Sequence, residues 1–370
     1  MTKLSRISLV NPIFNGNEKN YVTDCIDSSW ISSTGKYVNK FEEEFANFCE
    51  TRHGVTTANG TVALHLALLA LGVRQDDEVI VPTLTYIATA NAVTYCRARP
   101  IFVDSEQETW NIDPNRIEEK ITNKTKGIIV VHLYGHPVDM DPIIDLAKKY
   151  NLFIIEDAAE AHGAKYKDRT VGSIGDIGCF SFFGNKLITT GEGGIITTDS
   201  SELNQRMRLL RGQGMDPNKR YWFPIVGYNY RMTNIQAAIG LGQLENISFH
   251  LKKRREVANL YYKYFHNLLD LIEVPIEKDW ATHSFWMFSI LLKDRVKVSR
   301  DRLIELLDHD GIETRPLFYP MHVLPPYKEK TNSYLVAENI ALRGLNLPTH
   351  ALLTEENIKY IVDRISYHCR

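Results

Sequence analysis

Short runs of β-branched and apolar residues recur along the first half of the chain. The runs at 78–81, 100–103, 127–131 and 152–155 are continuous rather than alternating, which is typical of strands that are covered on both faces. Stretches with helical spacing, such as 141–150, separate several of them. This alternation predicts a largely parallel sheet built from βαβ units, with ligands bound at the carboxyl ends of its strands.

A helix that is apolar on nearly all sides, and therefore buried, is predicted to begin at 59–61 and to end at Gly72. Its first turn contains Gly60 and Thr61, and Asn59 precedes them. Several backbone N–H groups would point at one spot there, at the positive end of the helix dipole, which is an arrangement that binds phosphate. Helix capping alone uses the same residue types, so both interpretations stay open at this point.

The composition changes after residue 245. A long polar helix with a basic run at 252–255 comes first, and separate strand and helix patterns follow at 283–292 and 300–309. The basic run is typical of a solvated helix face. We therefore predict a large domain at 1–245 and a small C-terminal domain at 246–370.

Composition and charge limit the classes of function. The 370 residues are 44% hydrophobic and 24% charged, and the net charge of -2 gives no general attraction for nucleic acid or for a membrane surface. The five cysteines are scattered and form no C-x-x-C motif, which argues against a disulfide framework and against a zinc site. No apolar run approaches the roughly 20 residues that span a bilayer, and the N-terminus has no signal-peptide pattern. We expect small-molecule or protein partners and a cytoplasmic location.

One lysine stands between two predicted strands. The apolar run 179–183 leads into a turn that contains Lys186, and glycines at 191, 193 and 194 let the chain reverse into a second strand at 195–198. A lysine surrounded by apolar strands can be neutral enough to attack a carbonyl group, as a Schiff-base lysine does. The alternative is an ordinary lysine on a solvated loop.

Other polar residues follow the predicted strands. Asp157 ends a buried strand and needs a partner, which could be a cofactor, an arginine or the N–H groups of a helix that it caps. Tyr86 follows the first strand of the alternating series. His132 and His136 are four residues apart, but Gly135 and Pro137 break any helix between them, so we expect no metal site.

Together these residues match the demands of one cofactor. Pyridoxal 5'-phosphate requires a lysine for its aldehyde, a carboxylate for its pyridine nitrogen, donors for its phosphate and an aromatic face for its ring. The chain offers these groups, in that order, as Lys186, Asp157, Gly60 and Thr61 with Ser181, and Tyr86.

Longer motifs resemble a known family. They are Ala58-Asn59-Gly60-Thr61, the segment Phe182-Phe183-Gly184-Asn185-Lys186 with Gly-Glu-Gly-Gly at 191–194, and Arg315-Pro316-Leu317-Phe318-Tyr319-Pro320. With them, the whole chain resembles sugar aminotransferases of the DegT/DnrJ/StrS family. The resemblance implies the α/β architecture of pyridoxal phosphate fold type I, which is aspartate aminotransferase-like, with a mostly parallel sheet in a large domain and a smaller C-terminal α+β domain.

The resemblance also implies roles for single residues. Lys186 would be the catalytic residue that carries the cofactor and moves the proton. The cofactor would be bound by Asn59, Gly60, Thr61, Tyr86, Asp157, Glu160, Ser181 and, across a homodimer interface, Asn229. We further expect Trp30, Ser32, Arg315, Tyr319 and His322 to meet the substrate. Core packing of Tyr319 and a structural role for His322 are the alternatives. The active sites of the homodimer would be shared, since Asn229 reaches the phosphate held by the neighbouring subunit.

The expected reaction is transamination from L-glutamate to C4 of a GDP-linked keto sugar, GDP-4-keto-6-deoxy-D-mannose. A 4-aminotransferase for a UDP- or dTDP-linked 4-keto-6-deoxyhexose is the alternative within this class. A nucleotide-sugar oxidoreductase is a more distant alternative, but no G-x-G-x-x-G follows the first strand. A regulatory protein that has lost catalysis is the third, and the presence of Lys186 and Asp157 argues against it.

Overall fold

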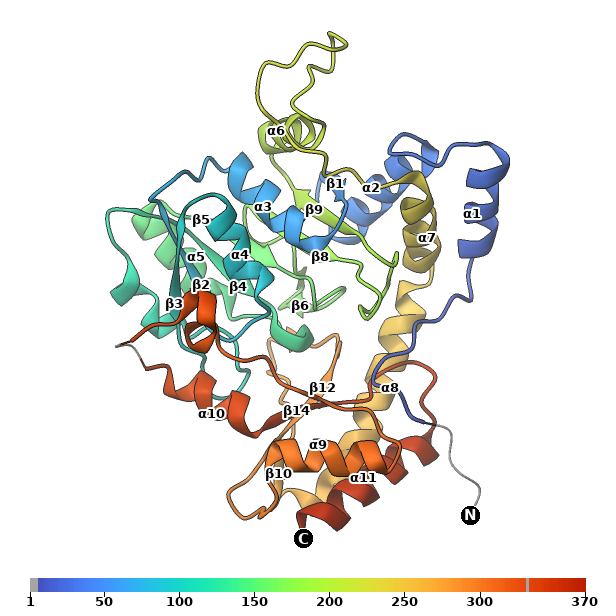
Figure 1. Cartoon of the computed structure of the whole chain (residues 1–370), viewed down its shortest axis with the longest axis vertical. Coiled ribbons are helices and arrows are strands. Elements are labelled where there is room, and N and C mark those ends of the chain that lie inside the picture. The colour runs from blue at the N-terminus through green and yellow to red at the C-terminus, as the bar shows by residue number, and fades with distance from the viewer. Residues whose placement is uncertain (1–5, 331–332) are drawn as a thin grey trace.

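The computed structural model describes residues 6–330 and 333–370. Its larger sheet has the strand order β1-β9-β8-β5-β4-β2-β3, and the β2–β3, β2–β4, β4–β5 and β5–β8 pairs are parallel (Figure 1). The strands are β1 His53–Thr57, β2 Glu78–Pro82, β3 Arg99–Val103, β4 Thr125–Val131, β5 Phe153–Asp157, β8 Ile177–Ser181 and β9 Gly194–Thr198. The predicted, mostly parallel sheet is confirmed.

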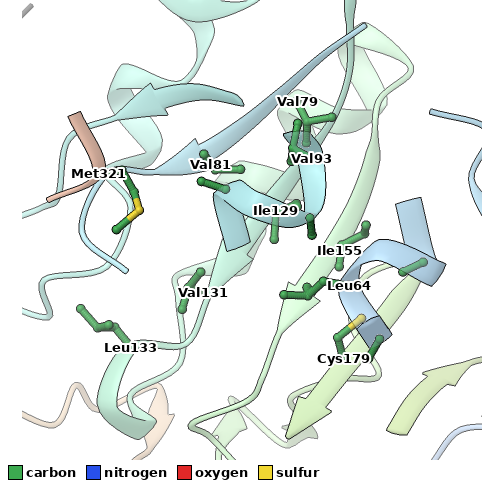
Figure 2. Close-up of a cluster of buried hydrophobic side chains, with 14 of the residues drawn as sticks. Leu64, Val79, Val81, Val93, Ile129, Val131, Leu133, Ile155, Cys179 and Met321 are labelled. Carbon is green, nitrogen blue, oxygen red and sulfur yellow. The ribbon is translucent and has the colours of Figure 1, made fainter. Parts of the chain in front are cut away.

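Helices cover both faces of this sheet, which explains why its strands read as continuous apolar runs. Figure 2 shows Val79, Ile129 and Ile155 of three neighbouring strands beneath Leu64 and Val93 of two helices. The alternate residues Ile80, Ile128, Val130 and Ile154 face a second core on the other side, together with residues of the helix Met140–Tyr150.

Local sequence signals explain where some helices in the first part of the chain begin or end. The helices of this part are α1 Glu18–Asp27, α2 Lys36–Phe48, α3 Gly60–Ala70, α4 Ala88–Tyr95, α5 Met140–Tyr150, α6 Ser201–Arg211, α7 Asn234–Glu245 and α8 Ile247–Phe265. The Asn59 side chain caps α3 by accepting from Val62 N–H, and Gly72 has a φ of +82° just beyond its end. Thr233 and Gln236 form a capping box at the start of α7.

The second part of the chain builds a smaller antiparallel sheet with the order β10-β12-β14-β13. Its strands are β10 Ile272–Glu273, β12 Phe288–Leu292, β13 Arg315–Pro316 and β14 Gly344–Leu347. Its helices are α9 Arg300–His309, α10 Leu335–Arg343 and α11 Glu355–Cys369. A separate core joins α8, α9 and α11 to this sheet, as expected of a smaller α+β unit.

Three very short strands form a third sheet with the order β11-β6-β7, in which Ala281–Thr282 pairs with Lys165–Tyr166 and the latter with Arg169–Thr170. This small sheet joins segments from the two parts of the chain. Within residues 6–330 and 333–370, no helix is long and apolar enough to cross a membrane.

The N-terminal segment reaches the C-terminal unit. Ile7 forms an isolated parallel bridge with Ile312, and Leu9 O accepts a hydrogen bond of 3.1 Å from Thr349 N–H. The boundary at 245/246 stays a prediction, and it falls at Asn246, the single residue between α7 and α8.

Candidate active site

A cavity of about 600 Å³ opens at the carboxyl ends of β4, β5 and β8, where the parallel sheet predicts a ligand. The first turn of α3 forms one wall, and residues 286–287, 315–316, 318 and 346 of the C-terminal part contribute another. The predicted site residues that line it are Asn59, Gly60, Thr61, Tyr86, Asp157, Glu160, Ser181, Lys186 and Arg315.

Lys186 lies in the loop between β8 and β9. Its Nζ is 3.9 Å from Oε1 of Glu160 and 3.9 Å from the centre of the Trp286 indole ring. Burial lowers the pKa of the Lys186 amine, while the charges of Glu160 and Asp157 act in the opposite direction. The solvated-loop interpretation is therefore wrong, since the side chain is only 11% exposed.

Asp157 is the last residue of β5 and is buried. Its Oδ2 accepts a hydrogen bond of 2.8 Å from Oγ1 of Thr89, and its Oδ1 accepts one of 3.3 Å from Ala159 N–H. Burial raises the pKa of the Asp157 carboxyl, and the Thr89 hydrogen bond opposes this effect. Among the described residues no arginine forms an ion pair with Asp157, which removes one of its structural explanations.

Glu160 is held by an unusual turn after β4. The backbone N–H of Tyr134, a residue with a left-handed φ of 53°, donates a hydrogen bond of 2.9 Å to Oε2 of Glu160. The Tyr134 ring stacks on Trp286 and on Phe318 at centroid distances of 6.2 and 5.3 Å. Burial raises the pKa of Glu160 to about 7, against the opposing charge of Lys186.

The first turn of α3 and the end of β8 form a narrow cradle. A Cβ atom at Gly60 would lie 2.7 Å from Cβ of Ser181, so only glycine fits without a shift. The hydroxyl-bearing residues Thr61 and Ser181 line the cavity beside the helix N-terminus. In the same cavity, Oδ1 of Asn185 is buried without a hydrogen-bond partner among the described residues. Small size, hydroxyl groups and the helix dipole together suit a phosphate group.

Comparison with known proteins identifies the family. The sequence model of the DegT/DnrJ/EryC1/StrS aminotransferase family matches residues 12–366. The chain belongs to this family. It is 52% identical to the GDP-perosamine synthase of Caulobacter vibrioides, with 98% of both chains covered. It is 51% identical to that of Escherichia coli O157:H7, with 97% of this chain and 98% of the relative covered.

Solved structures of aminotransferases share the fold. The aminotransferase from Psychrobacter cryohalolentis has a TM-score of 0.91 at 34% identity and covers 97% of this chain and 98% of its own. Helicobacter pylori PseC, an aminotransferase of pseudoaminic acid biosynthesis, has a TM-score of 0.93 at 27% identity, with 99% of both chains covered. The family and the neighbours confirm the fold type I architecture and an aminotransferase enzyme.

Several predicted substrate residues of this aminotransferase lie elsewhere. His322 is buried outside the cavity lining, where its Nδ1 is 2.7 Å from Thr83 Oγ1 and its Nε2 is 3.0 Å from Glu338 Oε1. These contacts favour the structural alternative for His322, and its substrate contact stays a prediction. Tyr319 is 53% exposed and does not line the cavity, although the neighbouring Phe318 does.

Trp30, Ser32 and Asn229 are exposed and also lie outside the lining of the cavity. Asn234 fixes the turn between α1 and α2, because its Nδ2 donates to Trp30 O and its backbone N–H donates to Ser32 O. Within one chain, these three predicted site residues are therefore not brought to the cavity.

The residues that line the cavity and were not predicted from the sequence include Thr89, Trp286 and Asn346. Thr89 follows Tyr86 in an ordinary helical stretch, and its link to Asp157 spans 68 positions. The indole of Trp286 reaches the Lys186 loop from the C-terminal part and donates from Nε1 to Asn185 O. No local sequence pattern signals contacts of this range.

Proposed function

We propose that this aminotransferase transfers the amino group of L-glutamate to C4 of GDP-4-keto-6-deoxy-D-mannose and thereby forms GDP-perosamine, a sugar donor for O-antigen polysaccharide. The observation that carries the proposal is the near full-length identity of 52%, 51% and 43% to three proteins named GDP-perosamine synthase. The buried amine of Lys186 in the cavity supports transamination.

The cofactor of the proposed reaction is pyridoxal 5'-phosphate, and the cavity residues fit it. Gly60, Thr61 and Ser181 would hold the phosphate in the cradle that Asn59 shapes by capping α3. Asp157 would pair with the ring nitrogen.

Two further contacts would complete the ring site. Glu160 would approach the ring hydroxyl, and Tyr86, which is 58% exposed at the cavity, would offer an aromatic face. When bound, the cofactor supplies an aldehyde that reacts with amines and a ring that withdraws electrons.

The proposed work of Lys186 is proton transfer at Nζ. A neutral amine is needed to take the proton from the carbon that bears the donor nitrogen, and burial favours this neutral form. The same amine then delivers a proton to C4 of the sugar. The Trp286 ring packs against Nζ and excludes water from one side of it.

A homodimer with shared active sites is part of the proposal. The loop between α6 and α7 projects from the body of the protein (Figure 1). Asn229 lies at the base of this loop, where it forms a bridge with Gly212. The loop side chains Tyr221, Trp222, Phe223 and Val226 are 71, 54, 52 and 87% exposed, and apolar side chains exposed together are typical of a protein interface. A partner subunit would cover them, and Asn229 of the partner subunit would reach the phosphate cradle. The five free, buried cysteines support the cytoplasmic location that we propose.

The proposed function is tested with purified enzyme, pyridoxal 5'-phosphate and L-glutamate against a panel of keto-sugar nucleotides. We expect the highest kcat/KM with GDP-4-keto-6-deoxy-D-mannose. Arg315, which lines the cavity and is half-exposed, is the cation that we expect at the substrate side. A higher kcat/KM with a UDP- or dTDP-linked 4-keto-6-deoxyhexose would replace the perosamine assignment by the alternative.

A further inference from the structure

The hydroxyl groups of two buried threonines form a hydrogen-bonded chain that ends at Asp157. Thr89 Oγ1 is 2.8 Å from Asp157 Oδ2, and Thr85 Oγ1 is 3.2 Å from Thr89 Oγ1. Thr85 and Thr89 are each 1% exposed, and both line the cavity. The three side chains therefore form a short hydrogen-bonded row in the wall of the cavity.

The direction of these hydrogen bonds follows from the number of protons. An ionised carboxylate only accepts, and a threonine hydroxyl has a single hydrogen to donate. The hydrogen of Thr89 therefore goes to Asp157, and Thr85 has to donate its own hydrogen to Thr89. An ionised carboxylate fixes this direction, because it has no hydrogen to donate back to Thr89.

A second threonine of the same helix shows that this geometry is not the default. The hydroxyl of Thr94 donates a hydrogen bond of 3.1 Å to Ala90 O, four residues earlier, as threonines within helices commonly do. Thr89 directs its hydroxyl to Asp157 instead. Its hydrogen bond is also shorter than the 3.3 Å bond from Ala159 N–H to the same carboxylate.

We infer that Thr89, supported by Thr85, is a positioning residue that orients Asp157 and keeps it ionised for the ring nitrogen of the cofactor. The inference rests on the proposed binding of pyridoxal 5'-phosphate. An ionised carboxylate in a buried site needs such a donor, because burial by itself favours the protonated acid. Without the Thr89 hydroxyl, Asp157 would take up a proton at a higher pH and bind a protonated pyridine ring less tightly.

The test is an equilibrium titration of the cofactor-free protein with pyridoxal 5'-phosphate from pH 5 to pH 9. Thr89→Val keeps the side-chain volume and removes the hydroxyl. We expect its dissociation constant at neutral pH to rise about tenfold. Affinity should fall at low pH as Asp157 becomes protonated, and this fall is the acid limb of the binding curve. We expect the midpoint of the acid limb to move up by about one pH unit in Thr89→Val. Thr85→Val should shift this limb less, in the same direction.

Two matched variants separate a positioning role from a packing role. Thr89→Ser restores the hydroxyl without the methyl group and should stay within about threefold of the wild-type dissociation constant. Thr94→Val removes a hydroxyl from the same helix and should bind like wild type.

Three outcomes would overturn the inference. Wild-type affinity and an unshifted acid limb in Thr89→Val would do so, and so would Thr89→Ser behaving like Thr89→Val. If circular dichroism shows that Thr89→Val is unfolded, an unshifted acid limb in Thr85→Val is decisive instead. Failure of the wild-type protein to take up the cofactor would refute the proposed function itself, and is thereby distinguished from failure of the inference.

Discussion

Nζ of Lys186 lies 3.9 Å from Oε1 of Glu160, and both side chains are almost completely buried. At this distance the charge on one group changes the pKa of the other. The protonation state of the amine therefore depends on that of the carboxyl, and the reverse. Lys186, the proposed proton carrier, is thereby coupled to Glu160, whose pKa burial raises to about 7.

Replacement of Lys186 by alanine removes the amine and leaves the cradle and Asp157 in place. We expect turnover with L-glutamate and the keto-sugar nucleotide to fall by at least about a thousandfold, because both the covalent anchor and the proton carrier are lost. The variant should still bind pyridoxal 5'-phosphate, measured by equilibrium dialysis. Lys126→Ala on the exposed side of β4 is the control, and substantial residual turnover in Lys186→Ala would contradict the role given to Lys186.

Glu160 gives the stability of the cofactor-free protein a specific pH dependence. A glutamate in the unfolded chain ionises near pH 4.3, whereas burial raises the pKa of folded Glu160 to about 7. Between these values the folded protein holds a proton that the unfolded chain has released, so this group lowers stability as the pH rises. Glu160→Gln cannot titrate, and we expect it to gain on the order of 2 kcal/mol relative to wild type between about pH 5 and about pH 7.

The measurement is urea denaturation of both proteins at a series of pH values. Other groups titrate in both proteins, so the difference between the two curves reports Glu160 and its coupling to Lys186. A difference that stays constant across the window would contradict the raised pKa of Glu160.

A methyl group at position 60 should close the phosphate cradle. The Cβ of Gly60→Ala would lie 2.7 Å from Cβ of Ser181. We expect affinity for pyridoxal 5'-phosphate to fall at least about tenfold. Gly184→Ala is a matched control, since its new Cβ would meet no atom closer than 4.0 Å and should leave affinity unchanged. Equal affinities of the two variants would contradict the proposal that the phosphate binds beside Gly60.

His322 offers a test of a structural role against a substrate role. His322→Gln disturbs the buried contacts with Thr83 and Glu338, and we expect a loss of about 1–3 kcal/mol in the free energy of unfolding. The KM for the keto-sugar nucleotide should change less than about twofold, since His322 does not line the cavity. The exposed His309→Gln serves as control for both measurements. A large rise in KM with unchanged stability would instead support the predicted substrate contact.

Shared active sites predict complementation between two defective proteins. In the proposed homodimer, Lys186→Ala and Asn229→Ala would each impair every active site. A mixed dimer holds one site in which both residues are intact, so mixing after mild dissociation should restore up to about a quarter of wild-type activity. Mixtures that stay as inactive as the separate variants would show that Asn229 does not act across the interface.

The parallel sheet was predictable because its physical causes are local. Strands such as β4 and β5 are buried on both faces, and this requirement is visible as an unbroken apolar run in each of them. The start of α3 was equally visible, since a cap by Asn59 and a glycine at position 60 are short-range features. Lys186 could be singled out because glycines and apolar strands surround it in the sequence itself.

Contacts between distant segments could not be predicted in this way. Trp286 meets Lys186 only because the C-terminal unit folds against the end of the large sheet, and Thr89 meets Asp157 across the space between α4 and β5. His322 was expected at the site because it follows Arg315 in a conspicuous loop. The chain turns between these residues, so that Arg315 lines the cavity and His322 packs behind it.

The strand-like contact of Ile7 with Ile312 bears on how the protein can be divided. A fragment that starts at residue 246 would lack the segment whose Ile7 amide donates to Gly311 O and whose Ile7 carbonyl accepts from Glu313 N–H. It would also expose the apolar surface that Ile7 covers in the C-terminal core. Expression of that fragment alone therefore calls for the first dozen or so residues to be supplied as a peptide or grafted through a linker.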